Sequence, residues 1–153
     1  MDSTLSLNCT TDASWQNGVA GVAASCFIYK EAASDWEGLL YICTAAFQIY
    51  ADNHNVAELR ATELALELAD RAMQHLHINV SQVRHLEVVS DSQCNIYSDD
   101  SPLPRYLHGI PVEYKWNPRR DSSIRAVDSR ARAVRMGFRP QGWGIYRIVD
   151  ARS

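Results

Sequence analysis

The hydrophobic pattern of this chain changes period after three segments of strand type, and this change limits the folds that it can adopt. Residues 5–10 alternate apolar with polar side chains, residues 19–29 are small, apolar and β-branched, and residues 39–50 are a third strand candidate. The residues at 16–18, Gln-Asn-Gly, supply the chemistry of a tight turn. The short connections predict an antiparallel meander.

A helical period follows the three strands. The segment from Asn55 to about His75 is rich in Ala, Leu and Glu. Its apolar positions (Val56, Leu59, Leu66 and Met73) share one face, and its acidic positions (Glu63, Glu67 and Asp70) lie on the other. Asn55 stands where an N-cap belongs. The strand candidate at 85–90 comes next, and a helix between two strands predicts a right-handed crossover and a parallel strand pair.

The remainder of the chain has a weaker pattern. Residues 92–110 contain two prolines that exclude a long helix, and residues 111–116 are a fifth strand candidate. Residues 124–135 predict a second helix that Gly137 ends, and residues 142–149 are a candidate for an extra strand. The predicted class is therefore α/β, with three strands, a helix and a strand followed by a further strand and helix.

Four carboxylates stand near the boundaries of these elements, where side chains can converge. Asp12 follows the alternating part of the first strand, Glu58 begins the long helix, Asp91 closes the fourth strand and Asp128 begins the late helix. Three of them have an alternative explanation. Glu58 fits a capping box with Asn55, Asp128 fits a favourable first helical turn, and Asp91 fits a turn after a strand.

The charges divide the chain into two regions. Residues 1–114 hold 5 of the 15 Lys and Arg and 15 of the 18 Asp and Glu, a balance of −10, whereas residues 115–153 have a balance of +7. Nine of the ten basic residues in the second region are arginines, whose planar guanidinium suits phosphate. This asymmetry favours a protein that holds a polyanion with one region and metal ions with another. The alternative is a solvated basic helix that pairs with the acidic body.

Composition excludes several classes of protein. No apolar run approaches the ~20 residues that cross a bilayer, and the polar start of the chain does not resemble a signal peptide, so an intracellular protein, cytoplasmic or nuclear, is expected. The four cysteines (Cys9, Cys26, Cys43 and Cys94) form no C-x-x-C pair. They are interpreted as reduced and mostly buried side chains. The five histidines have no metal-ligand spacing.

Four motifs in order resemble the ribonuclease H superfamily, in particular its compact archaeal and plant reverse-transcriptase-like type. T-D-A-S-W at 11–15 is similar to the first hairpin of that family, and N-H-N-V-A-E-L-R-A at 53–61 to its helix start. V-V-S-D-S-Q at 88–93 resembles the end of its fourth strand. W-N-P-R at 116–119, with A-V-D-S-R-A-R at 126–132, resembles its closing motif. The resemblance spans residues 4–135, almost the whole chain.

The resemblance implies a ribonuclease H-like fold, with a five-stranded mixed sheet in the order 3-2-1-4-5 between helices. It implies a catalytic and metal-binding tetrad of Asp12, Glu58, Asp91 and Asp128 that holds Mg²⁺ or Mn²⁺, with two ions expected. It also implies hydrolysis of the RNA strand of RNA–DNA hybrids. The implied substrate-binding residues are Ala13, Ser14, Asn55, Ser92, Arg119, Arg120 and Arg125, because they would contact 2′-hydroxyls or the phosphate backbone.

The chain also departs from the family pattern. Only 37 residues separate Asp91 from Asp128, and the loop at 119–123 contains no histidine. Two alternatives to the hybrid nuclease therefore stay open: a ribonuclease H-like module that binds nucleic acid or protein without cleavage, and a DNA-acting relative of the resolvase or integrase type. The expected organisation is a domain at 1–140 and a tail at 141–153. The expected partner is nucleic acid and not a membrane, and the expected state is a monomer or weak dimer.

Overall fold

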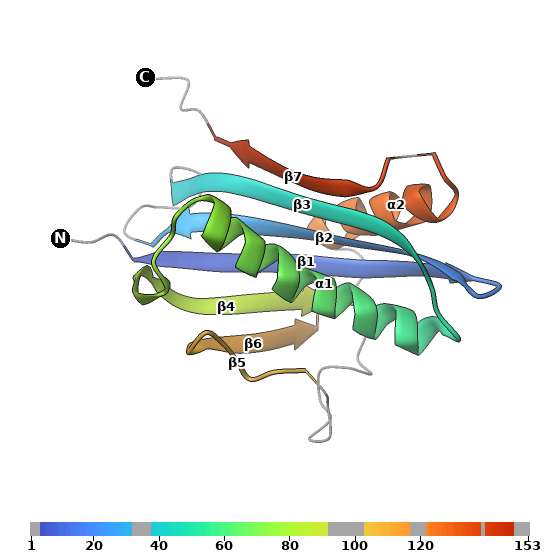
Figure 1. Ribbon diagram of the computed structural model, residues 1–153, viewed down its shortest axis with the longest axis horizontal. Coiled ribbons are helices and arrows are strands. Elements are labelled where there is room, and N and C mark those ends of the chain that lie inside the picture. Colours follow the sequence, from blue (N-terminus) through green and yellow to red (C-terminus); the bar gives the residue numbers. More distant parts are fainter. Residues whose placement is uncertain (1–3, 32–37, 92–102, 117–121, 139, 149–153) are drawn as a thin grey trace.

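The computed structural model contains a mixed sheet with one helix on each face (Figure 1). It describes residues 4–31, 38–91, 103–116, 122–138 and 140–148. The elements in chain order are β1 (Leu5–Gln16), β2 (Val19–Lys30), β3 (Leu39–Tyr50), α1 (His54–His75), the 3₁₀ turn η2 (Val80–Gln82), β4 (Val83–Ser90), β5 (Tyr106–Leu107), β6 (Ile110–Trp116), α2 (Ser122–Arg135) and β7 (Gly142–Arg147).

The predicted five-strand order is present at the centre of the sheet. β3, β2, β1, β4 and β6 are neighbours in that order, so that β6 is the predicted fifth strand. β1 pairs antiparallel with β2 and parallel with β4, which confirms a mixed sheet. The β1–β2 turn has positive φ at Asn17 and Gly18, as a two-residue hairpin requires.

The predicted number of five strands is wrong, because the described residues form seven. β7 is the extra strand that was predicted at 142–149, and it extends the sheet beyond β3. The two-residue β5, which was not predicted, extends the sheet beyond β6. An unpaired edge on the long strand β3 would expose a row of backbone donors and acceptors, and β7 covers part of that row from Tyr41 to Ala46. β5 is too short to produce a recognisable alternation in the sequence.

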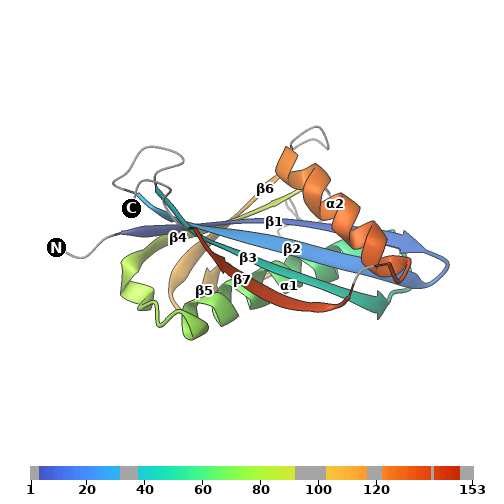
Figure 2. The same cartoon turned by 90° about the horizontal axis from the view of Figure 1, so that it is seen from above.

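The two helices lie on opposite faces of the sheet (Figure 2). Successive side chains of a strand point to opposite faces, so alternate residues of β1 meet different helices. Thr11 Oγ1 donates a 2.6 Å hydrogen bond to the Ala61 carbonyl of α1. Ser14, on the other face, accepts a 2.8 Å hydrogen bond from Arg135 Nε of α2. β1 is therefore the strand against which both helices are positioned.

Three cysteines form a row across neighbouring strands under α1. Cys9 of β1 is opposite Cys26 of β2, which is opposite Cys43 of β3. All three are free and inaccessible to solvent. This confirms the prediction of reduced, buried cysteines for these three, whereas Cys94 lies outside the described residues. Within the described part of the chain, none of the helices combines the length and apolarity that a membrane crossing needs.

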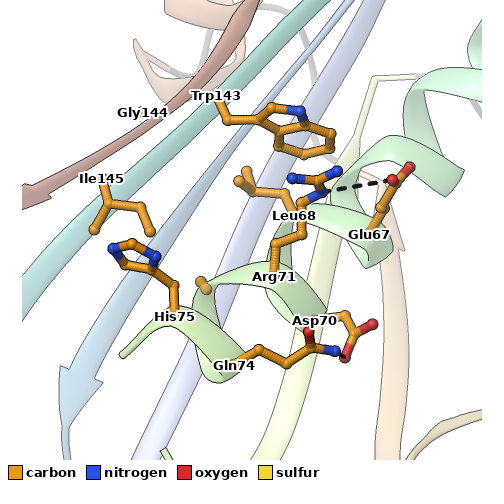
Figure 3. A pocket seen from close by; sticks show the side chains of 10 residues that line it. Glu67, Leu68, Asp70, Arg71, Gln74, His75, Trp143, Gly144 and Ile145 are labelled. Atoms are coloured by element: carbon orange, nitrogen blue, oxygen red, sulfur yellow. Dashed lines mark hydrogen bonds and ion pairs between the residues drawn. The ribbon is translucent and has the colours of Figure 1, made fainter. Parts of the chain in front are cut away.

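β7 creates a cavity of about 830 Å³ against the second half of α1. Figure 3 shows Trp143 and Ile145 on the side of β7 that faces this helix. The Arg71 guanidinium lies 4.2 Å from the centre of the Trp143 ring and also pairs with Glu67 at 3.7 Å (Figure 3). Phe47 of β3 packs against the same indole, with ring centres 5.1 Å apart. These contacts hold the added strand to the rest of the fold.

Candidate metal centre

β4 ends one residue short of Asp12, and this difference in length creates the site. Ser90, the last residue of β4, is opposite Thr11 of β1. Asp12 is still paired with Ala23 of β2 on its other side. The edge of β1 that β4 covers therefore stops before Asp12. Because Asp91 is the residue that follows β4, its carboxylate is brought beside that of Asp12.

Glu58 reaches the same place from α1. The bond between Thr11 and Ala61 fixes the helix over β1, and Glu58 lies about one helical turn before Ala61. Asp12 and Glu58 are both buried, with 0% exposure. Asp12, Glu58 and Asp91 each place a carboxylate oxygen within 4.8 Å of the other two. Three of the four predicted carboxylates are thus gathered into one group.

Burial and the neighbouring negative charges strongly raise the pKa of Asp12 in this group. Desolvation is the largest cause that raises the pKa of the Asp12 carboxyl, from its ordinary 3.8 to about 10. The negative charge of Glu58, a hydrogen bond with the Asp128 side chain and the charge of Asp91 raise this pKa further, whereas the Ala13 N–H lowers it. Without a cation, Asp12 therefore holds a proton at neutral pH.

Asp128 approaches Asp12 from the opposite face of the sheet. It lies on α2, and its side chain interacts with that of Asp12. It is not in the group of three whose oxygens lie within 4.8 Å of one another. Its Oδ2 is 3.3 Å from Arg132 Nη2, one turn later in the helix. Asp128 is therefore at the border of the cluster and already has a cationic neighbour.

The cluster fits a divalent cation. Asp12 Oδ1 accepts a 2.9 Å hydrogen bond from the Ala13 N–H. Asp12 Oδ2 is buried, and among the described residues no donor bonds to it. A buried carboxylate oxygen without a donor is costly unless a cation or a proton neutralises it. Carboxylate oxygens are also the hard ligands that Mg²⁺ and Mn²⁺ prefer.

Three local predictions about these acids were wrong. The N-cap of α1 is Asn53, not Asn55, because Asn53 Oδ1 accepts a 2.9 Å hydrogen bond from Val56 N. Glu58 is consequently beyond the first turn and forms no capping box with Asn55. α2 begins at Ser122, earlier than expected, so Asp128 lies in its second turn rather than its first. The capping box for Glu58 and the first-turn position for Asp128 therefore fail as explanations, and the positions of the two acids need another reason.

Four of the seven predicted substrate-binding residues lie in the described part of the chain. Ala13 is buried beside Asp12, and Ser14 bonds to Arg135. Asn55 is exposed on the first turn of α1, and Arg125 is exposed on α2. The other three, Ser92, Arg119 and Arg120, lie outside the described residues.

Two contacts of the cluster were not predicted. His54 Nε2 lies 3.3 Å from Glu58 Oε1, and Arg132 pairs with Asp128. Both are i,i+4 pairs on a helix, a spacing that places side chains next to one another. The signal was therefore present in the sequence, although it does not separate these pairs from ordinary surface pairs.

No protein-family model and no curated protein matches this sequence. Solved structures do match it. The N-terminal ribonuclease H domain of a Mycobacterium tuberculosis protein, solved as a fusion with maltose-binding protein, has a TM-score of 0.59 at 14% identity, over 88% of this chain and 96% of that chain. RNase H1 of the halophilic archaeon Halobacterium salinarum has a TM-score of 0.54 at 17% identity, over 84% and 96%.

A third match is LC11-RNase H1, whose structure was solved in complex with an RNA/DNA hybrid. Its TM-score is 0.59 at 15% identity, and the match covers 86% of this chain and 97% of that chain. All three matches cover nearly the full length of the solved domains. The architecture that the four sequence motifs implied is thus confirmed, and this chain has the ribonuclease H-like fold.

Proposed function

We propose that this chain is a metal-dependent endonuclease that hydrolyses the RNA strand of RNA–DNA hybrids. The observation that carries the proposal is the group of Asp12, Glu58 and Asp91, whose carboxylate oxygens converge to within 4.8 Å at the end of β4. Such a group lowers the stability of the fold through desolvation and repulsion. Its presence, with the pKa of Asp12 strongly raised, favours a functional role. The structural likeness to RNase H1 proteins, one of them bound to an RNA/DNA hybrid, supports the choice of reaction.

Asp12, Glu58, Asp91 and Asp128 would hold the divalent ions, either Mg²⁺ or Mn²⁺. When bound, two such ions lower the pKa of a water molecule and stabilise charge on the leaving oxygen of a phosphodiester. Asp12 would be the central ligand of the four, because the charges of Glu58 and Asp91 and the Asp128 side chain all act on its carboxyl. The Ala13 N–H fixes its Oδ1 at 2.9 Å and so sets the direction of Oδ2.

The substrate would be held by residues around this cluster. Ser14 Oγ accepts from Arg135, which leaves its hydroxyl hydrogen available to a sugar or phosphate oxygen. Asn55 and Arg125 are exposed and free to contact the duplex, Asn55 at a 2′-hydroxyl and Arg125 at a phosphate. Ser92, Arg119 and Arg120 complete the proposed set. Monomer or weak dimer remains the predicted state.

The test is cleavage of a labelled RNA–DNA hybrid with Mg²⁺, with Mn²⁺ and with chelator. Asp12→Asn should lower the cleavage rate by about a hundredfold or more, since even residues that only support metal ligands contribute ~10- to 100-fold. The matched control is Asp52→Asn, an exposed acid close to the start of α1 that should cleave like the parent protein. Full activity in Asp12→Asn would exclude the proposal. Duplex DNA, duplex RNA and junction substrates tested in parallel identify a DNA-acting relative.

One observation favours a second candidate, a module that binds nucleic acid without cutting it. The Arg132 guanidinium lies 3.3 Å from Asp128 and competes for the carboxylate that would bind a cation. This candidate predicts that hybrid binding survives in Asp12→Asn and that the parent protein has no metal-dependent turnover. Arg132→Gln separates the two candidates further, because releasing Asp128 should alter the metal requirement of a nuclease and leave a pure binding module unchanged.

A further inference from the structure

A second pocket lies on the side of β7 that faces α2. Its volume is about 240 Å³, below the ~300–1,000 Å³ of typical small-molecule sites, so it suits a single small group. Its lining includes Arg130 of α2, Thr44 of β3, and Gln141 and Tyr146 from the β7 segment. No carboxylate is among the described residues that line it. Among the described lining residues, the pocket therefore contains one positive charge and no opposing one.

Arg130 is unusual among the arginines of α2. Arg132 pairs with Asp128, and Arg135 donates to Ser14 and Gln16. Arg130 Nη1 is buried, yet no described residue accepts a hydrogen bond from it. A guanidinium donor removed from water without an acceptor is costly, and an anion in the pocket would supply the missing partner.

Two hydroxyl groups converge on the same pocket. Thr44 is opposite Gly144 in the β3–β7 pair. A Cβ atom at position 144 would lie 3.0 Å from Thr44 Oγ1 and 3.0 Å from the Tyr146 hydroxyl. Glycine at this position therefore leaves open the space that both hydroxyls border. Planar guanidinium and hydroxyl donors together are a typical set for phosphate.

The pocket is separate from the carboxylate cluster. Asp12, Ala23, Ala46 and Gly142 are successive partners across four strands, which places the pocket about 14 Å from Asp12 at ~4.8 Å per strand. Asp128 and Arg130 are two residues apart in α2 and so point to opposite sides of the helix. A ligand of Arg130 is therefore not held by the carboxylates.

We propose that this pocket binds a phosphate group, with Arg130 supplying the charge and Thr44 and Tyr146 supplying hydrogen bonds. The ligand is either a free phosphate or a phosphate of a nucleic-acid backbone, and both present the same oxygens. This inference goes beyond the proposed nuclease activity and does not depend on it, because none of its residues belongs to the cluster.

In the test, inorganic phosphate is titrated into the Asp12→Asn protein with chelator present. Binding is monitored by calorimetry and by NMR of the arginine Nε resonances. Sodium chloride at equal ionic strength is the reference. Saturable phosphate binding that Arg130→Met weakens about tenfold or more is expected, since a charge-assisted set of hydrogen bonds is lost. Arg147→Met is the matched control, because Arg147 is exposed on the same strand and outside the lining, and it should bind like the parent.

Two further variants keep the proposal falsifiable if Arg130→Met is unstable. Thr44→Val and Tyr146→Phe remove one hydroxyl each with little change of volume, and each should weaken phosphate binding severalfold. Phosphate that acts no differently from chloride, or equal binding in Arg130→Met and the parent, would overturn the proposal. A single-stranded oligonucleotide and its uncharged methylphosphonate analogue then distinguish the source: an Arg130 effect on the charged strand alone indicates backbone phosphate, and no effect on either indicates a free phosphate.

Discussion

Gly21 of β2 lies directly against the backbone of Ala131 in α2. A Cβ atom at position 21 would overlap the Ala131 carbonyl oxygen and approach Arg135 N to 2.7 Å. The helix therefore rests on the sheet at a point where no side chain separates them. Asp128 precedes Ala131 by about one turn, so this close contact also sets the depth at which Asp128 approaches Asp12.

Gly21→Ala should displace α2, because the atoms that the new methyl group meets are backbone atoms that no rotamer change can move. A loss of about 1–3 kcal/mol in the free energy of unfolding is expected, as for other overpacked sites. Urea denaturation measures the loss, and metal-dependent cleavage per folded molecule should fall with it. Gly109→Ala is the control, because Gly109 lies in a turn with φ of +84° and no atom within 4 Å of a new methyl group. It should lose stability through backbone strain alone and keep full cleavage per folded molecule. Equal stability of Gly21→Ala and the parent would show that α2 is not seated as described.

The sequence predicted β2, β3 and α1 well because their patterns are long and their periods strong. The third strand, Leu39–Tyr50, begins and ends where it was expected. Close packing such as that at Gly21 is indicated in the sequence only by the glycine itself. A glycine within a strand indicates that something approaches closely, but it does not say which element does so. The partner of Gly21 is more than a hundred residues later in the chain, and only the tertiary fold identifies it.

Trp143→Ala should loosen β7 without disturbing the carboxylate cluster. The indole contacts Phe47 and the Arg71 guanidinium, and it is half-buried, so a loss of about 1–3 kcal/mol of unfolding free energy is expected. Cleavage per folded molecule should be unchanged, because β7 contributes no residue to the cluster. Thermal denaturation and hybrid cleavage measure the two effects, and Tyr146→Phe, at an exposed residue of the same strand, is the stability control.

The thiols of Cys9, Cys26 and Cys43 should not react with disulfide reagents in the native protein. Burial raises the pKa of the Cys43 thiol to about 12, and the pKa of Cys26 is raised by its contact with Cys9 and by burial. A buried thiol that is not ionised reacts slowly with disulfide reagents. In a Cys94→Ser variant, none of the three should react under native conditions and all three should react in denaturant. Rapid native labelling of any one would mean that the sheet opens beneath α1.

The carboxylate site was predictable in part, for a reason that concerns strand ends. Asp91 follows the end of β4, and Asp12 lies on the parallel neighbour β1, so the order of the elements brings the two carboxylates to the same part of the sheet. The environment of Asp128 was harder to predict, because it depends on where α2 begins and on how closely that helix packs. The Arg130 pocket was not predictable at all. It is formed by side chains from α2, β3 and β7, and no local sequence pattern links them.

Asp12→Asn should stabilise the metal-free protein at neutral and alkaline pH. The pKa of Asp12 is raised in the folded state to about 10, whereas the unfolded chain loses this proton near pH 4. Between these values the folded state binds more protons than the unfolded state, so the stability of the parent protein falls as pH rises. Asparagine carries no charge to desolvate, so the variant does not lose stability in this way as pH rises.

Thermal and urea denaturation in chelator, from pH 4 to pH 9, should therefore give curves for the two proteins that meet near pH 4 and diverge above it. The variant should be more stable by about 1–3 kcal/mol at pH 8. Adding Mg²⁺ should raise the stability of the parent and leave the variant nearly unchanged, because a ligand stabilises only the state that binds it. Parallel pH curves for the two proteins would mean that Asp12 is neither buried nor repelled as described, and would remove the electrostatic basis for a cation at this site.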